Sequence, residues 1–240
     1  MKRAIIFDFG QTLANSADGF RTAEKEAEID IFSRIGVASW TDFMSEYRKI
    51  RKEFQGRSDF SRKSMWEKIC LHFGVRADDD FLTDCEGRYW DTVEAQTALF
   101  PEVLGVLDQL SRKYMLSVIT NTQGQEQAGR HRFAGFPELS GYLQAVIVAG
   151  ESGIPPKPDP APFRICLEKL GLAAGEAVFV GDDLRIDILG AQSVEIDPIW
   201  LKHYSVKRSW PEVEAPCPVI TSLDQLLLLD RILSGSSDTV

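Results

Sequence analysis

The chain has 240 residues, of which 44% are hydrophobic and 26% charged, and its formal net charge is −9. This composition predicts a globular protein with enough apolar material for one large domain, or for a domain with a substantial insertion. The acidic balance argues against nucleic acid as a partner and against an anionic membrane surface, because both attract basic proteins. A phosphorylated substrate is not excluded, because a local site can be positive in an acidic protein.

The N-terminus and the cysteines favour a cytoplasmic protein. The first apolar run, 4–7, is too short for the core of a signal peptide or for a membrane span. The four cysteines form no CxxC pair and no zinc-type spacing. We expect them to be buried or partly buried thiols in a reducing compartment.

The first element is a strand. Residues 4–7 are apolar, are too few for a helix, and end at Asp8, with Gly10 marking a turn directly afterwards. This pattern is typical of a parallel strand buried on both faces.

Residues 17–98 are predicted to form an insertion of about four helices, because apolar residues recur there at intervals of three and four. No strand pattern appears in this region. After Pro101, helices alternate with short apolar strands. Strands are predicted at 115–119, 145–148, 177–180, 198–201 and 219–220, and helices at 102–113, between 121 and 144, at 161–170, after 183 and at 226–229. Such alternation predicts a parallel sheet covered on both faces.

Polar side chains follow several of these strands. Asp8 follows the first, Thr120 and Asn121 follow the second, and Asp182 and Asp183 follow the fourth. Lys157 lies in the Pro-rich loop 154–160. Each residue alone has an ordinary explanation as a turn residue, a helix cap or a solvated lysine. Together they favour a site, because ligands bind beyond the carboxyl ends of parallel strands.

These segments resemble the four motifs of the haloacid dehalogenase-like hydrolases. The matching segments are Asp8-Phe9-Gly10-Gln11-Thr12-Leu13, Ile119-Thr120-Asn121, Lys157-Pro158-Asp159-Pro160 with Phe163, and Val180-Gly181-Asp182-Asp183 with Asp187 and Gly190-Ala191. The helical insertion is similar to the cap of the subgroup whose cap lies between the first two motifs. The resemblance implies an α/β, doubly wound, Rossmann-like core of residues 1–15 and 98–240, with an inserted helical cap of residues 16–97.

The resemblance also implies a magnesium-dependent phosphatase that acts on a small phosphorylated metabolite. Asp8 would be the nucleophile and would form an aspartyl-phosphate, assisted by Thr120 and Lys157 as catalytic residues. The implied ligands of Mg²⁺ are Asp8, the Gly10 carbonyl and Asp182, surrounded by Thr12, Asp183 and Asp187. The implied substrate-binding residues are Phe9, Gly10, Gln11, Thr120, Asn121 and Lys157.

Gly10 departs from the family pattern, because phosphatases of this family usually carry a second Asp there that transfers a proton. In an active phosphatase the proton would come from water, from the substrate, or from a cap acid such as Asp18 or Glu24. The alternatives are a phosphate-binding or interaction protein without turnover, a carbon–halogen hydrolase, a transferase to an acceptor other than water, and a hydrolase of phosphorus–carbon bonds. The last would need a cap lysine as a Schiff base, among Lys49, Lys52, Lys63 and Lys68.

Basic residues cluster between positions 48 and 63 of the helical insertion. They are Arg48, Lys49, Arg51, Lys52, Arg57, Arg62 and Lys63. One interpretation is a solvated helix surface, and the other is that one or two of them meet a second anionic group on the substrate. The sequence fixes neither the identity of the substrate nor the oligomeric state.

Overall fold

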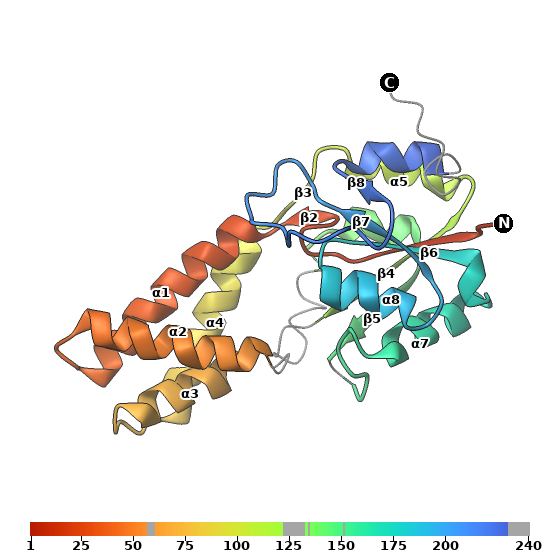
Figure 1. The fold of residues 1–240 in the computed structure, drawn as a ribbon. Helices are drawn as coiled ribbons and strands as arrows, with labels where there is room; N and C mark the ends of the chain where they lie inside the picture. The colour runs from red at the N-terminus through yellow and green to blue at the C-terminus, as the bar shows by residue number, and fades with distance from the viewer. Residues whose placement is uncertain (57–60, 122–132, 134, 151, 230–240) are drawn as a thin grey trace.

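The main sheet is parallel, as predicted, and has six strands in the order β5-β4-β1-β6-β7-β8 (Figure 1). The computed structural model describes residues 1–56, 61–121, 133, 135–150 and 152–229. The strands are β1 (Ala4–Phe7), β4 (Met115–Asn121), β5 (Leu143–Ala149), β6 (Ala177–Gly181), β7 (Asp197–Leu201) and β8 (Val219–Ile220).

Helices cover both faces of this sheet, which confirms the predicted fold class (Figure 1). One face carries α5 (Val103–Ser111) and the 3₁₀-helix η4 (Leu223–Leu228), and the other carries α7 (Pro160–Leu170) and α8 (Leu189–Gln192). Strand β1 supplies side chains to both layers: Ile5 and Phe7 join the hydrophobic cluster that contains α5, whereas Ile6 joins the one that contains α7. All four residues of β1 are therefore buried.

The four predicted helices lie between β1 and β4 in sequence and extend to one side of the sheet (Figure 1). They are α1 (Ala17–Ile35), α2 (Trp40–Gly56), α3 (Arg62–His72) and α4 (Asp79–Ala95). Their apolar faces form a hydrophobic cluster of their own, which includes Ile31, Tyr47 and Trp66.

The chain enters and leaves these helices through a two-stranded antiparallel sheet, β2 (Ala14–Asn15) with β3 (Ala98–Leu99). The sequence did not predict this pair, because strands of two residues show no alternation.

Two further segments differ from the expectation. The last predicted helix is the 3₁₀-helix η4, and the helix expected after β6 begins as a π-helical turn, η3 (Leu184–Ile188), before α8. Much of the helix expected between 121 and 144 falls on residues 122–132 and 134, outside the described residues, and a 3₁₀-helix, η1 (Pro137–Gly141), follows. A short 3₁₀-helix, η2 (Ala174–Glu176), precedes β6.

Among the described residues, every helix is too short or too polar to cross a membrane.

The sheet topology brings the predicted site residues to one edge. Strand β1 lies between β4 and β6, and Phe7 is in register with Val118 and Val180. Because all three strands run in the same direction, the residues that follow them meet at the carboxyl edge of the sheet.

Gly190 allows α8 to approach α7 and the loop before it closely. A Cβ atom at this position would lie 2.9 Å from Phe163 Cζ and 3.3 Å from the backbone Cα of Pro158. The absence of a side chain thus lets α8 pack against the loop that contains Lys157.

We predict that Gly190→Ala destabilises the protein by about 1–3 kcal/mol, because overpacking forces Phe163 and the adjacent loop apart. For a chain of this size each kcal/mol lowers the melting temperature by about 2–4 °C, which thermal unfolding can measure. Gly175→Ala is the matched control, because its Cβ would meet nothing within 4 Å. Equal melting temperatures for the two variants would contradict this account.

Candidate active site

Lys157 is the centre of the site. Its side chain is only 1% exposed, and its Nζ donates hydrogen bonds to Asp8 Oδ1 at 2.7 Å, Asp187 Oδ1 at 2.7 Å and the Ile119 carbonyl at 2.8 Å. All three ammonium hydrogens therefore have acceptors. Burial lowers the pKa of Lys157, but the facing carboxylates of Asp187 and Asp8 more than offset this and hold it above its usual value.

Three buried carboxylates, Asp8, Asp182 and Asp187, face one another around this lysine. One oxygen from each lies within 4.8 Å of the others. Burial, together with the carboxylates of Asp187 and Asp8, raises the pKa of Asp182 well above its usual value. Burial likewise raises the pKa of Asp187 to about 7, against the opposing effect of Lys157. The cluster therefore holds more negative charge than Lys157 alone balances.

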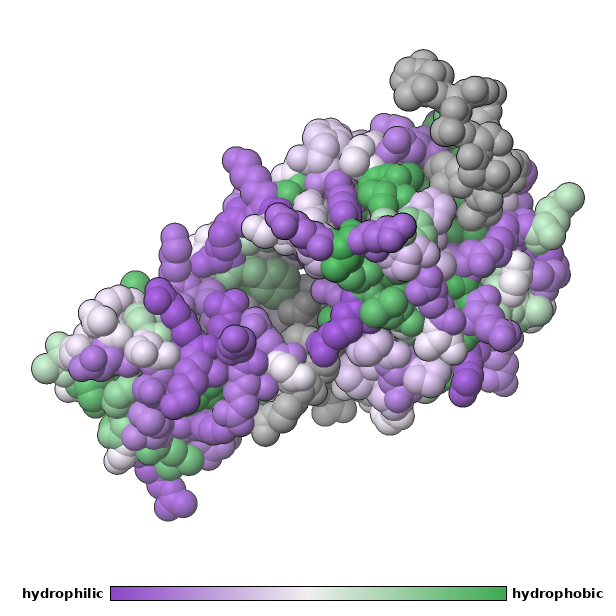
Figure 2. Space-filling view, viewed as in Figure 1, coloured by the Kyte–Doolittle hydropathy of each residue, from purple (hydrophilic) through white to green (hydrophobic). Residues whose placement is uncertain are grey.

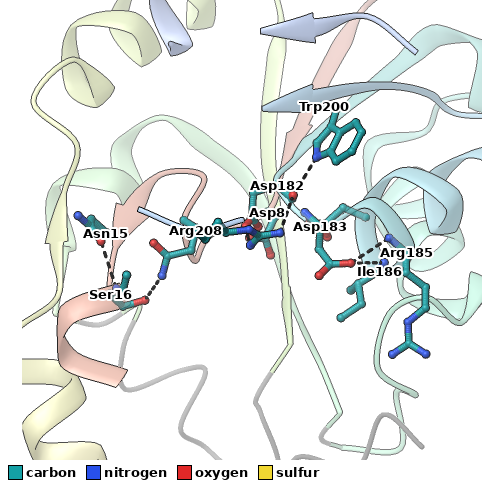
Figure 3. Close-up of polar contacts among 12 residues, drawn as sticks. Asp8, Asn15, Ser16, Asp182, Asp183, Arg185, Ile186, Trp200 and Arg208 are labelled. Carbon is teal, nitrogen blue, oxygen red and sulfur yellow. Dashed lines mark hydrogen bonds and ion pairs between the residues drawn. The ribbon is translucent and has the colours of Figure 1, made fainter. Parts of the chain in front are cut away.

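Arg208 supplies a second cation that the sequence analysis missed. Its Nη1 lies 2.5 Å from Asp182 Oδ2, and its Nη2 donates to the Asp182 carbonyl at 3.2 Å (Figure 3). The same carbonyl accepts a hydrogen bond from Trp200 Nε1 at 2.9 Å. The guanidinium group also stacks on the ring of Trp210, 4.2 Å from its centre. The only signal in the sequence was that Arg208 lies in the loop after β7, at the same edge of the sheet.

The predicted surrounding residues take distinct positions. Asp183 accepts hydrogen bonds from the N–H groups of Arg185 and Ile186 and so caps η3, the ordinary helix-cap explanation weighed above (Figure 3). Asp187 reaches both Lys157 and, through Oδ2, the N–H of Asp183. Thr12 is fully buried, and its hydroxyl has no hydrogen-bond partner among the described residues.

Asn121 is tied to the backbone of Lys157. Its Oδ1 accepts from the Lys157 N–H at 2.9 Å, and its Nδ2 donates to the Lys157 carbonyl at 3.1 Å. These two bonds hold the lysine loop against the end of β4. Asn121 and Thr120 also line the pocket above the cluster, and Thr120 is only 2% exposed.

The loop after Asp8 is a tight turn that uses several of its own polar groups. The Gln11 N–H donates to the Ala14 carbonyl at 2.7 Å, and the Gln11 side chain donates to Ser16 Oγ at 3.0 Å. Gln11 has a φ of 61°, an uncommon left-handed conformation for a residue with a side chain. The Gln11 N–H thus already donates a hydrogen bond within the loop.

The side chain of Phe9 is directed into the core. It is 1% exposed, and its ring packs against Phe133 and Phe136.

A pocket of about 570 Å³ lies between this edge of the sheet and helices α1–α4. Figure 2 shows a hollow at this place, bordered by hydrophilic residues. Its floor contains Asp8, Gly10, Lys157, Asp182 and Asp187, and Arg48, Arg51 and Arg62 belong to the opposite wall.

Other residues from the sequence analysis fall outside the lining of this pocket. They are Phe9, Thr12, Asp18, Lys49, Lys52, Lys63 and Lys68. Glu24 does line it, but accepts hydrogen bonds from Tyr47 and Tyr89. Arg57 lies outside the described residues.

The donor set fits a small divalent cation. Three converging carboxylates offer the hard oxygen ligands that Mg²⁺ prefers, and Mg²⁺ usually keeps several waters besides. Both carboxylate oxygens of Asp187 already accept hydrogen bonds, from Lys157 and from the N–H of Asp183. Asp8 and Asp182 are therefore better placed as direct ligands of the ion. The fit therefore agrees with two of the side chains that the resemblance implied.

The parallel sheet and the buried lysine–carboxylate cluster define an α/β protein with a candidate site at the carboxyl ends of its strands. Comparison with known proteins identifies the family: residues 2–195 match the model of the haloacid dehalogenase-like hydrolases. The chain belongs to this family and is a hydrolase.

Two curated relatives cover most of the chain. A phosphoglycolate phosphatase of Pectobacterium atrosepticum is 37% identical over 200 residues, which is 80% of this chain and 76% of that protein. A ribulose-1,5-bisphosphate 5-phosphatase of Halopiger xanaduensis is 26% identical over 208 residues, 83% of this chain and 84% of that protein. A crystal structure of a 2-haloacid dehalogenase from Pseudomonas syringae pv. Tomato DC3000 is 26% identical, covers 98% of this chain and 99% of that one, and has a TM-score of 0.67.

We predict that Arg208→Gln lowers the stability of the metal-free protein by about 1 kcal/mol, because the carboxylate cluster loses one of its two cations. In chelator, the melting temperature should fall by about 2–4 °C. Adding Mg²⁺ should raise it more in the variant than in the unmodified protein, since the ion then supplies the missing charge. Lys207→Gln, an exposed neighbour in the same loop, is the control. Equal metal-free stability with and without Arg208 would contradict the prediction.

Proposed function

We propose that the protein is a magnesium-dependent phosphatase that acts on a small phosphorylated metabolite through an aspartyl-phosphate on Asp8. One observation carries the proposal: the buried Lys157 bridges Asp8 and Asp187 at the floor of a pocket, beside Asp182. The names of the curated relatives, which are phosphatases, support the same reaction class.

In the proposed reaction, the Asp8 carboxylate attacks phosphorus, the bond between phosphorus and the leaving oxygen breaks, and that oxygen takes a proton from water because Gly10 has none to give. Water then attacks the mixed anhydride, releases inorganic phosphate and regenerates Asp8. Lys157, held 2.7 Å from Asp8, offsets the repulsion between this carboxylate and the phosphate dianion. Mg²⁺, held by Asp8, the Gly10 carbonyl and Asp182, would supply further positive charge at the same place.

The remaining residues position these groups. Thr120 would donate its hydroxyl to a phosphate oxygen, and Asn121 holds the Lys157 loop in place. The Gln11 N–H already donates a hydrogen bond within its own turn. In this loop, the N–H groups of Phe9 and Gly10 would therefore bind the phosphate oxygens. Asp183 and Asp187 stabilise η3 and Lys157.

We also propose that residues 16–97 act as a cap over a core of residues 1–15 and 98–240. The pocket lies between the two, and α1–α4 supply one of its walls, which supports this proposal. A cap of this kind excludes water and selects the substrate. We also propose that the protein acts in the cytoplasm.

The alternatives have less support from the geometry. The four lysines considered for a Schiff base do not line the pocket, although another lysine of the helical insertion, Lys25 on α1, does. Although one structural relative is a 2-haloacid dehalogenase, the acidic cluster of Asp8, Asp182 and Asp187 favours chemistry that uses a cation. A protein that binds phosphate without turnover is the outcome that the following experiment would expose.

We predict magnesium-dependent hydrolysis of phosphomonoesters, measured as phosphate release from a panel that includes an activated aryl phosphate. Chelator should abolish it, and Asp8→Asn should lower it by about 10⁴–10⁶-fold, because the nucleophile is lost. Asp108→Asn, an exposed acid on α5, is the matched control. If no ester is hydrolysed but calorimetry still detects binding of phosphate, the protein is a phosphate-binding protein and not a phosphatase.

A second prediction concerns the missing proton donor. A Cβ at Gly10 would meet only Ser16 Oγ, at 4.0 Å, so an aspartate side chain has room. Gly10→Asp should raise kcat on alkyl phosphates by about 10²-fold or more, since general acid catalysis typically contributes that much. For kcat/KM, which reports formation of the aspartyl-phosphate, the effect on an aryl phosphate should be much smaller, because its leaving group needs less help. Gly10→Asn is the control, because its side chain has nearly the same shape as that of Asp but cannot act as an acid. An equal gain in rate from both variants would contradict a role for the missing proton donor.

A further inference from the structure

The pocket wall opposite Asp8 contains a buried charge cluster of its own. Its centre is Glu24, which is 6% exposed and accepts a hydrogen bond from Tyr47 Oη at 2.9 Å and a longer one from Tyr89 Oη at 3.4 Å. Two guanidinium groups face the same carboxylate: Arg51 Nη1 lies 3.4 Å from Oε1, and Arg62 Nη2 lies 3.6 Å from Oε2.

Among the described residues, the ion pairs of this cluster join two arginines to one carboxylate, and both contacts are longer than a direct hydrogen bond of normal length. Glu28 and Glu86 interact electrostatically with Arg51 and Arg62 respectively, but neither lies within ion-pair distance of them. The side chain of Arg62 is only 12% exposed. The Nε atoms of Arg51 and Arg62 are buried and have no hydrogen-bond partner in the described part of the chain. Buried positive charge without a matching anion is costly, so the cluster favours an additional anionic group.

The cluster is also held rigidly before any ligand binds. Trp66 Nε1 donates to Tyr47 Oη at 3.1 Å, and Arg62 Nη2 donates to Tyr89 Oη at 2.9 Å. The guanidinium group of Arg62 lies over the Tyr89 ring, 5.0 Å from its centre. These contacts fix the arginine in place, which lowers the entropic cost of binding an anion.

The two charged ends belong to one pocket. Arg51 and Arg62 line the same cavity as Asp8 and Lys157, and its volume of about 570 Å³ is within the usual range for small-molecule sites. Arg48 lies on the same side as the arginine pair. A single metabolite of suitable length can therefore contact Asp8 at one end and the arginines at the other.

We propose that Arg51 and Arg62 form a second anion subsite, so that the substrate is a phosphomonoester with a carboxylate or a second phosphate remote from the reacting phosphate. This inference rests on the proposed function and deepens it. The planar guanidinium fork suits both groups, because each presents two oxygens in matching geometry. A substrate with a neutral end would leave the arginines unpaired, so the subsite also rejects it.

The first experiment measures binding without turnover. Calorimetry with the full chain and Mg²⁺ compares ω-carboxyalkylphosphonates of two to six carbons with alkylphosphonates of the same lengths, which cannot be hydrolysed at a phosphoester. At one chain length the carboxylate should bind about tenfold to a hundredfold more tightly than its alkyl partner, the usual effect of a hydrogen bond between charged groups. Alkane diphosphonates of the same lengths show whether the subsite prefers phosphate to carboxylate.

The second experiment assigns the preference to the arginines. Arg62→Gln and, separately, Arg51→Gln should reduce the preference at least severalfold, and the affinity for the alkylphosphonate should stay equal or rise, because its neutral end no longer faces an unpaired arginine. Lys49→Gln, on the same helix as Arg51 but exposed and outside the pocket lining, should keep the full preference. Circular dichroism checks that each variant is folded, and Arg51, being 36% exposed, provides a variant with less risk to folding.

The outcomes separate this inference from the function on which it rests. Binding of phosphonates or turnover of phosphomonoesters, with no preference for a second anion at any length, overturns the subsite alone. A preference that survives both arginine substitutions also overturns it. Failure of every phosphonate to bind, together with no magnesium-dependent turnover, overturns the proposed function and the subsite with it.

Discussion

The contact of Lys157 with Asp8 and Asp187 is the interaction on which the site depends. It joins the end of β1, the loop before α7 and the helical turn after β6, three segments far apart in sequence. A lysine that is 1% exposed is stable as a cation only beside carboxylates, and carboxylates this close are stable as anions only beside cations. The rest of the site compensates for the charge that remains, through Arg208 and through backbone N–H groups.

The sequence predicted the parts of this arrangement that follow from simple rules. A short apolar run that ends in Asp8 defined β1, and the shared direction of parallel strands brought Asp8, Thr120 and Asp182 to one edge. The motif resemblance gave the fold class and the family, both of which are confirmed. The roles assigned to individual side chains remain proposals.

What the sequence did not predict depends on how particular loops run. Arg208 reaches Asp182 from a loop with no periodic pattern, and only the three-dimensional course of residues 202–218 reveals the contact. The same holds for the Gln11 N–H, which is used within a turn, and for Asn121, which bonds to a backbone 36 residues away. Among the basic residues of the helical insertion, packing decides which ones face the pocket: Arg62 does and Lys63 does not.

Gly10 affects both halves of the proposed cycle, because the residue that would protonate the leaving group is also the one that would deprotonate the attacking water. With no side chain there, opening of the mixed anhydride is slowed as well as its formation. If the proposed cycle holds and the leaving group is good enough for the first half to proceed, the acyl phosphate on Asp8 would be the longest-lived species, and the enzyme would spend most of each turnover phosphorylated. The lifetime of that covalent state, rather than the affinity for substrate, then sets the rate at saturation.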